Sequence, residues 1–399
     1  YGKFTVSNSI VYNDVGPYAI NETYSQQQGF PYSSTGLNGF VIAGTAVDAS
    51  VGKEKIATLE FGLGLGLFNN RVTLDASYYT STTTDLITTA TTAPSAGSSA
   101  ILTNIGSIDG DSYELSLGLT PFKALNNGDF NWNLNTNFTT TKQTVTKIQD
   151  GVDEINIGGT TVAGIYAVVG EAFPQIKATS YERDPQGRVV IDAATGNPKV
   201  GGLKSLGQVT PKYIVGLTNA FSYKGFTLTT TMDYRTGHVY YSQLGDRMEF
   251  TGRSQESVSA NRQDFIFPNS VTNTGTADNP VYVVNNNIQT TGGGQNFWTN
   301  TFNDIKENYV KDATSLKIRE VSLRYELPDK YINNIGLSKV TLGLIARNLA
   351  VWLPKENRFS DPEFNNNPLN DEEINAIGIG GYKQSPPTRS FGLNVNLEF

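Results

Sequence analysis

The sequence contains no cysteine and a single histidine, His238, in 399 residues. Without cysteine there can be no disulfide, no thiol nucleophile and no Cys/His zinc site. One histidine leaves at most one base for a Ser/His/Asp arrangement. Most enzyme chemistry is therefore excluded, and we expect a protein that is not an enzyme and uses no cofactor.

Long apolar runs and excess positive charge are also missing. The longest apolar stretch, near residues 162–170, is much shorter than the roughly 18 residues of a membrane helix. The net charge of −7 has the wrong sign for binding a phosphate backbone, so nucleic acid is not an expected partner. No cationic and apolar leader follows Tyr1, so we expect that any signal peptide has been removed or lies upstream.

Apolar and polar residues instead alternate with a period of two, which predicts strands with two different faces. The clearest run is 57–67, where Leu and Phe alternate with Gly, Glu and Thr; a turn at 69–70 leads into a second run from residue 72. We predict about ten strands, with a bulge near 319–320 where the alternation changes phase. The others lie at 4–12, 113–119, 130–138, 213–223, 226–234, 316–325, 340–346 and 391–399.

Short and long connections between these strands alternate strictly. The short ones lie at 69–70, 121–129, 224–225 and 328–338, and the long ones at 13–54, 82–110, 147–209, 236–313 and 353–388. Outer-membrane barrels have short periplasmic turns and long extracellular loops. The fold class predicted is therefore all-β, a transmembrane antiparallel β-barrel with the long loops outside the cell. A two-faced soluble sheet is the alternative.

Aromatic residues gather near the predicted strand ends, as in the two interfacial girdles of a membrane barrel. Near the short turns are Phe68, Phe122, Phe130, Trp132, Tyr223, Phe226 and Tyr325, and near the long loops are Tyr78, Tyr79, Tyr234, Tyr240, Tyr241 and Trp352.

Several motifs carry a family resemblance from about residue 55 to the end of the sequence. They are GEAFP at 170–174, DPQG at 184–187, TPKY at 210–213, DYRTG at 233–237, YVKDATSLKIREVSL at 309–323, RNL at 347–349, DPE at 361–363, PPTRSF at 386–391 and the final Phe399. Together they resemble the SusC-like (SusC/RagA) family of TonB-dependent outer-membrane transporters. No single motif would be sufficient.

The resemblance implies an active importer of glycans or oligopeptides in the outer membrane, embedded in lipid. It also implies a SusD-like surface lipoprotein as partner and energy delivered through the TonB complex. Barrels of this family have roughly 22 strands and an amino-terminal plug, neither of which this sequence can supply alone. We therefore expect residues 1–399 to be the C-terminal segment of the barrel, without the plug and the N-terminal strands.

Two rival functions stay open on the sequence alone, a self-contained porin and a ten-stranded barrel hydrolase. A hydrolase would need His238 beside Asp233 and Ser242, but no known spacing supports such a triad. The stretch 361–372 places oxygen-bearing side chains in a calcium-like pattern, although Asn366 replaces the usual glycine and Pro368 intrudes. A polar extracellular loop is the preferred interpretation.

Four aromatic residues near the longest loop are candidates for contact with a ligand or partner, or for packing that loop onto itself: Tyr240, Tyr241, Phe297 and Trp298. Phe399 ends an outward apolar row and is predicted to belong to a barrel-assembly signal, with a girdle position as the alternative. Gly62, Gly64 and Gly66 are expected to face the lumen and leave room for a plug or solute.

Overall fold

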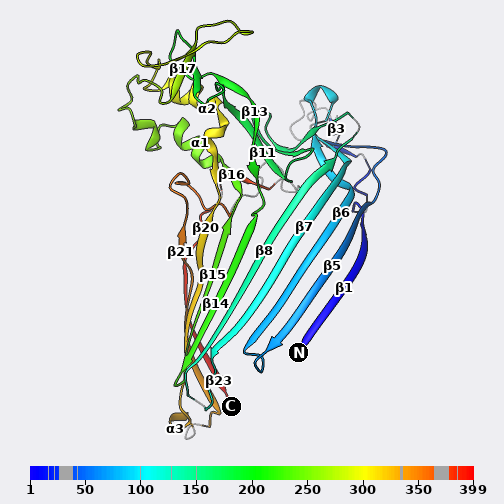
Figure 1. The fold of residues 1–399 in the computed structure, drawn as a ribbon, viewed down its shortest axis with the longest axis vertical. Helices are drawn as coiled ribbons and strands as arrows, with labels where there is room; N and C mark the ends of the chain where they lie inside the picture. Colours follow the sequence, from blue (N-terminus) through cyan, green and yellow to red (C-terminus); the bar gives the residue numbers. More distant parts are fainter. Residues whose placement is uncertain are drawn as a thin grey trace.

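A computed structural model describes residues 1–16, 18–21, 23–26, 39–42, 44–98, 100–126, 128–149, 151–332, 336–363, 377–383 and 385–399. Its main feature is an antiparallel wall of ten long strands, in which each strand is hydrogen-bonded to the one that follows it along the chain (Figure 1). The strands are β1 (Gly2–Asn13), β5 (Glu54–Leu67), β6 (Val72–Thr91), β7 (Ala100–Phe122), β8 (Asn131–Lys147), β14 (Tyr213–Tyr223), β15 (Phe226–Thr236), β20 (Ser315–Glu326), β21 (Lys339–Trp352) and β23 (Ser390–Glu398). The ten predicted strands are confirmed.

The wall is an open sheet, as predicted. Within the described residues, β1 pairs only with β5, and β23 pairs only with β21. Both outer strands therefore present unpaired backbone groups along one edge. Such edges are not tolerated in lipid, because each unsatisfied N–H or C=O costs several kcal/mol.

The register of the wall follows from its turns and its alternation. Lys224 and Gly225 both have positive φ, at 47° and 82°, and join β14 to β15 in a two-residue turn. This geometry matches the twist of the paired strands. The predicted bulge is also confirmed, because Ile318 and Glu320 have partners on both neighbouring strands and the register shifts across Arg319.

One predicted loop is wrong. Residues 82–110 continue the hairpin, since β6 and β7 remain paired in antiparallel fashion as far as Thr91 and Ala100. Only residues 92–99 connect them, and the 3-10 turn η2 (Pro94–Ala96) lies there. A tilted crossing uses roughly 9–11 residues, whereas β6 has 20 and β7 has 23. The upper half of this hairpin therefore extends past the membrane.

The predicted long loop 147–209 is mostly a second sheet. It contains β9 (Glu154–Gly159), β10 (Ala163–Val168), β11 (Gln175–Tyr181), β12 (Val189–Ile191) and β13 (Val200–Gln208). Four of these strands pair in the order β13-β11-β10-β9. Their buried side chains share one core with the upper ends of β6, β7 and β8, where Ile105 and Val145 are nearly inaccessible.

Residues 236–313 form the rest of the folded mass at this end. A second core joins Tyr181 and Ile191 to Phe267, Phe297 and Trp298. Small sheets β12-β17-β18 and β19-β16-β22 connect the pieces. The elements are β16 (Val239–Ser242), α1 (Gln243–Phe250), η3 (Glu256–Val258), β17 (Ser270–Asn273), β18 (Tyr282–Val284), the π-helical turn η4 (Phe297–Thr301), α2 (Phe302–Asp304), η5 (Lys306–Tyr309), β19 (Val310–Asp312) and, further on, β22 (Ile379–Gly380).

The two ends of the wall therefore differ strongly. Figure 1 shows the folded mass at the upper end and only short connections, with α3 (Asp329–Ile332), at the lower end. We call the upper part, residues 148–209 and 237–313, the cap. The first long connection contributes β2 (Tyr24–Gln26), β3 (Phe40–Ile42) and β4 (Thr45–Val47), the last of which pairs in parallel with β7. None of the helices in the described ranges is long and apolar enough to cross a membrane.

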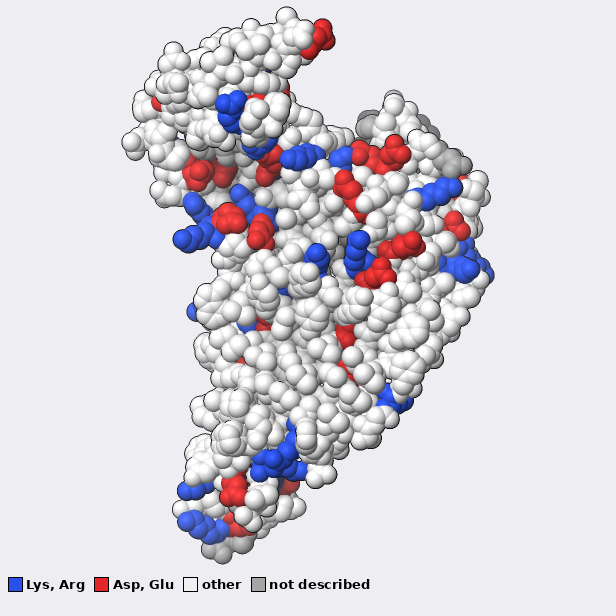
Figure 2. Space-filling view, viewed as in Figure 1, with Lys and Arg blue, Asp and Glu red and all other residues white. Residues whose placement is uncertain are grey.

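Charge and aromatic side chains follow the same division. In Figure 2, Lys, Arg, Asp and Glu gather toward the upper end and at the lower tip, and the middle of the visible face is mostly uncharged. Near the short turns, Phe226 stacks on Tyr325 at 4.2 Å between ring centroids, and Trp132 on Phe221 at 5.5 Å. The girdle assignment is wrong for Tyr240 and Tyr241, since both are buried in the cap on β16.

Candidate functional site

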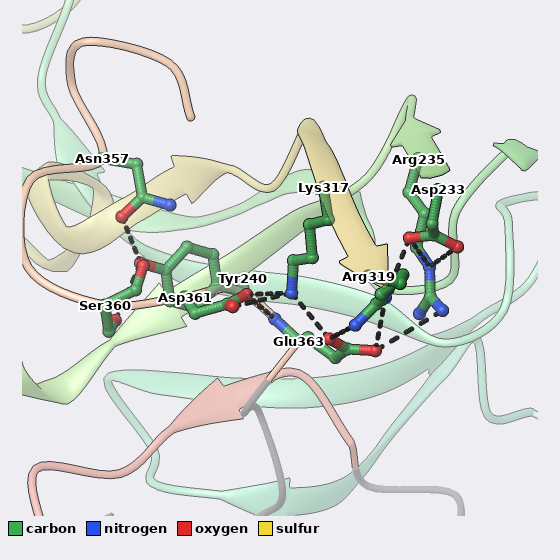
Figure 3. A network of polar contacts seen from close by, with 9 residues as sticks. All are labelled: Asp233, Arg235, Tyr240, Lys317, Arg319, Asn357, Ser360, Asp361 and Glu363. Atoms are coloured by element: carbon green, nitrogen blue, oxygen red, sulfur yellow. Dashed lines mark hydrogen bonds and ion pairs between the residues drawn. The ribbon is translucent and has the colours of Figure 1, made fainter. Parts of the chain in front are cut away.

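Six charged side chains meet where β15 and β20 reach the cap, beside the segment that follows β21 (Figure 3). Strand alternation puts Met232 and Tyr234 of β15, and Ile318 of β20, on the outer face of the wall. The charged residues next to them in the two strands therefore point toward the lumen. We call this set the mouth network. It consists of Asp233 and Arg235 on β15, Lys317 and Arg319 on β20, and Asp361 and Glu363 after β21.

Two cations of β20 hold the loop. The ammonium of Lys317 lies 2.6 Å from Asp361 and 2.6 Å from Glu363. The guanidinium of Arg319 donates two hydrogen bonds to the Glu363 carboxylate, at 2.6 and 2.8 Å, and one to Asp233 at 2.9 Å. Such bidentate contacts fix geometry as well as charge. Lys317 and Arg319 are two residues apart on β20, so strand alternation puts both on the same face, toward the same loop.

The mouth network is partly buried, which makes its charges interdependent. The side chains of Lys317 and Asp361 are 6% and 8% exposed. Burial opposes ionisation of Glu363, but the hydrogen bonds from Arg319 and Lys317 outweigh it and lower the pKa of Glu363 to about 2. Removing one member would leave a buried charge without its partner. The network therefore fixes the loop end to the inner wall.

A neutral contact extends the same attachment into the cap. The Tyr240 hydroxyl donates to Asn357 Oδ1 at 2.5 Å and lies 3.0 Å from the Ser360 hydroxyl. Burial raises the pKa of Tyr240, so the hydroxyl stays protonated and can donate. Residues 357–363 are thus held from both sides, by the wall and by β16.

A catalytic grouping around His238 is not formed. Within the described residues, Asp233 is paired with Arg235 and Arg319, and the Ser242 hydroxyl caps α1 by accepting from Gly245 N. Burial, with Arg235 nearby, lowers the pKa of His238 to about 4, and among the described residues its Nδ1 has no hydrogen-bond partner. In the part of the chain that the structure describes, the imidazole is a neutral buried side chain with no nucleophile hydrogen-bonded to its Nδ1.

The calcium pattern at 361–372 can be followed only in part, because residues 364–372 lie outside the described ranges. Asp361 and Glu363 are described, and both are engaged by Lys317 or Arg319. Calcium binding therefore stays a prediction, and these two carboxylates already have partners.

The four aromatic candidates are all buried. Tyr240 and Phe297 are fully inaccessible, and Tyr241 and Trp298 are 6% and 5% exposed. Phe297 packs against Phe265 and Trp298, with centroid distances of 5.2 and 5.1 Å. This burial favours packing of the loop onto itself, the other interpretation open from the sequence. Ligand or partner contact stays a prediction, and Tyr241 lines a cavity.

Two further sequence expectations concern the wall. The room beside Gly62 is not free, because a Cβ there would lie 2.5 Å from Thr5 Oγ1, and one on Gly64 would lie 3.1 Å from Asp75 Oδ1. These glycines allow close approach of cross-strand side chains. Phe399 follows β23 and is 92% exposed. Its role in assembly stays a prediction.

The comparisons with known proteins agree with this architecture. No family model matches the chain. TonB-dependent receptor P3 of Formosa agariphila is 27% identical over 388 residues, which cover 91% of this chain and 36% of the relative. TonB-dependent receptor SusC of Bacteroides thetaiotaomicron is 24% identical over 246 residues, 58% of this chain and 24% of SusC. A solved structure of the RagAB peptide transporter superposes with a TM-score of 0.70 at 18% identity and covers all of this chain.

The resemblance to SusC-like TonB-dependent transporters is therefore confirmed, and the ten strands are part of an outer-membrane β-barrel. The chain spans 36% of the length of receptor P3 and 41% of the RagAB chain that it matches. A partial barrel agrees with the two free edges of the wall.

Proposed function

We propose that the protein is an active outer-membrane importer that takes up nutrients with energy from TonB. One observation carries the proposal: a folded cap with its own buried cores stands at one end of the wall only, and the mouth network fastens the adjoining loop to the lumen side. Loops carried on a rigid scaffold are where binding residues concentrate, so substrate entry is placed at this end. The names of the relatives support TonB as the energy source.

In this proposal residues 1–399 supply the C-terminal strands, and the remainder of the complete protein supplies the plug and the other strands. A self-contained porin would need a closed barrel, whereas β1 and β23 are both edges within the described residues. A barrel hydrolase would need a base hydrogen-bonded to a nucleophile, and within the described residues the Nδ1 of His238 has no hydrogen-bond partner. The pKa of His238, lowered to about 4, also makes it a weak base.

For cargo and partner we propose an oligopeptide and a SusD-like surface lipoprotein seated on the cap. RagAB is a peptide transporter, and its solved structure matches the full length of this chain. A glycan is the second candidate, through the resemblance to SusC. The cap is the expected seat because it is the folded mass at the long-loop end of the wall.

The test is uptake by cells that produce the complete protein. A labelled mixture of short peptides and a labelled mixture of neutral oligosaccharides are supplied to the producing strain, to a strain without the protein, and to the producing strain after TonB is removed. We expect peptide uptake that needs both the protein and TonB. Uptake that persists without TonB would favour a porin, and conversion of the label outside the cell would favour a hydrolase.

A further inference from the structure

A cavity of about 350 Å³ lies between the cap and residues 379–383. Helix α1, the turn between β9 and β10, and β22 surround it. Val162, Ala163 and Ile379 form an apolar side, and Tyr241 lines it from β16. The cavity is open to solvent, and none of the mouth-network residues lines it.

Charge in this cavity opposes that of the whole chain. Three cations line it, Arg247, Lys306 and Lys383, against a single carboxylate, Asp246. The net charge of the chain is −7, so a surplus of positive charge at one cavity is a local feature. A cavity with one sign of charge raises the local concentration of the opposite ion.

The single carboxylate is already satisfied. Asp246 accepts a hydrogen bond from Asn303 at 2.6 Å on one oxygen. Its other oxygen accepts from the Tyr241 hydroxyl at 2.7 Å and from Lys306 at 3.1 Å. Lys306 and Asp246 therefore neutralise each other, and the surplus charge belongs to Arg247 and Lys383.

These two cations share one aromatic ring. The Arg247 guanidinium lies 5.6 Å from the centroid of Tyr382, and the Lys383 ammonium lies 5.7 Å from it. Both side chains are exposed. In the described part of the chain, neither side chain has a hydrogen bond or ion pair. Their remaining N–H donors are free to bind an anion, and Tyr382 limits their positions without neutralising them.

We propose that this cavity binds a carboxylate group of the cargo, with Arg247 and Lys383 as the binding cations and Tyr382 as the positioning residue. The guanidinium fork suits the two oxygens of a carboxylate. The apolar side formed by Val162, Ala163 and Ile379 suits an apolar neighbour of that group. This inference rests on the proposed import function and narrows the cargo to molecules with a free acid, such as a peptide C-terminus.

The test compares acids with their neutral forms on the purified complete protein. The probes are N-acetylated Ala-Ala-Ala-Phe as the free acid and as the C-terminal amide, and digalacturonate beside its methyl ester. We expect the free acid to bind at least about tenfold more tightly than the neutral form, since charge-assisted contacts exceed neutral ones. The Arg247→Gln/Lys383→Gln variant should lose this preference.

The matched control is Lys53→Gln/Arg253→Gln, which removes the same charge at two exposed positions away from the cavity. It should keep the preference, as should Lys383→Arg. Acid binding that depends on Arg247 and Lys383 supports the proposal, and the probe that shows it tells whether peptide or uronate bears the carboxylate. Equal affinity for acid and neutral forms, no binding of either acid, or an unchanged preference in the double variant would overturn it.

Cell uptake separates this inference from the import function. If neutral and acidic probes enter equally well in a TonB-dependent manner, the importer stands and the carboxylate site is wrong. If no probe enters in that manner while the purified protein still prefers acids through Arg247 and Lys383, the site stands and the import proposal is wrong.

Discussion

The wall and the cap are built on different physical rules. In the wall, large apolar side chains such as Leu63, Leu323 and Leu344 are 40%, 40% and 59% exposed. In the cap, side chains of similar size, such as Ile165 and Phe297, are fully inaccessible. The wall is stabilised by ladder hydrogen bonds and by lipid on its apolar face, and the cap by an apolar core away from water.

This difference predicts that the two parts respond differently to the same kind of substitution. A truncated side chain in the cap should open a cavity, whereas one on the outer face of the wall should be replaced by lipid. The mouth network joins the two parts. Its loss should therefore release the segment that follows β21 without unfolding the wall or the cap.

The largest effect is expected for Phe297→Ala in the second core of the cap. Burial of this ring is complete, so its removal should destabilise the cap by about 3–5 kcal/mol. Protease cleavage between residues 237 and 313 on intact cells should rise steeply, and the heat-modified gel mobility of the barrel should stay unchanged. Leu344→Ala in the wall is the matched control and should change neither readout.

If Phe297→Ala and Leu344→Ala gave the same protease sensitivity, the distinction between wall and cap would be lost. Loss of the heat-modified mobility in Phe297→Ala alone would mean that the cap supports the wall, which contradicts separate stabilisation.

The mouth network should give the next largest effect. Lys317→Met leaves Asp361 buried without its cation, and breaking such a pair costs roughly 3 kcal/mol, at the low end for buried pairs because Glu363 keeps Arg319. Residues 353–363 should become accessible to protease. Lys317→Met/Asp361→Leu, which removes both buried charges, should recover most of the protection. A double variant as sensitive as Lys317→Met would contradict a charge-based attachment.

Two buried groups of the cap should give a smaller, pH-dependent effect with opposite signs. Burial lowers the pKa of His238 from 6.5 to about 4. The contribution of His238 to the stability of the cap is therefore complete above pH 6.5 and is lost as the pH falls toward 4. Burial raises the pKa of Glu249 from 4.5 to about 7. The contribution of Glu249 to the stability of the cap is therefore complete below pH 4.5 and is lost as the pH rises toward 7. Between pH 4.5 and 6.5 the two slopes oppose each other.

The prediction is measured as cap stability against pH in two variants. In His238→Gln only Glu249 titrates of the two, so the free energy of unfolding of the cap should fall as the pH rises through this window. In Glu249→Gln only His238 titrates, so it should rise. Each slope should be at most about 1.4 kcal/mol per pH unit. The double variant should be flat. Glu363 titrates below this window. Slopes of the same sign in the two single variants would contradict the assignment.

The same division explains what the sequence could predict. Alternation in 57–67 and 213–223 defines wall strands because each wall residue faces either lipid or lumen. The hairpin beyond residue 82 was missed because Thr88 and Thr89 give no contrast between faces. In the cap, Ile165 and Ile176 belong to a core that also contains residues from distant segments of the chain. A periodic pattern within one segment cannot predict such contacts. Alternation along β20 indicates that Lys317 and Arg319 share a face, but nothing in the local sequence indicates that Asp361 and Glu363, more than 40 residues later, are their partners.

The most direct measurement tests whether the cap lies outside the cell and the short turns inside. Because the chain has no cysteine, single thiols can be introduced cleanly at two exposed positions, Asp278→Cys in the cap and Leu125→Cys between β7 and β8. A membrane-impermeant maleimide added to intact cells should label Asp278→Cys and leave Leu125→Cys unlabelled, although both react after denaturation. Labelling of Leu125→Cys alone would reverse the orientation of the wall and contradict the account.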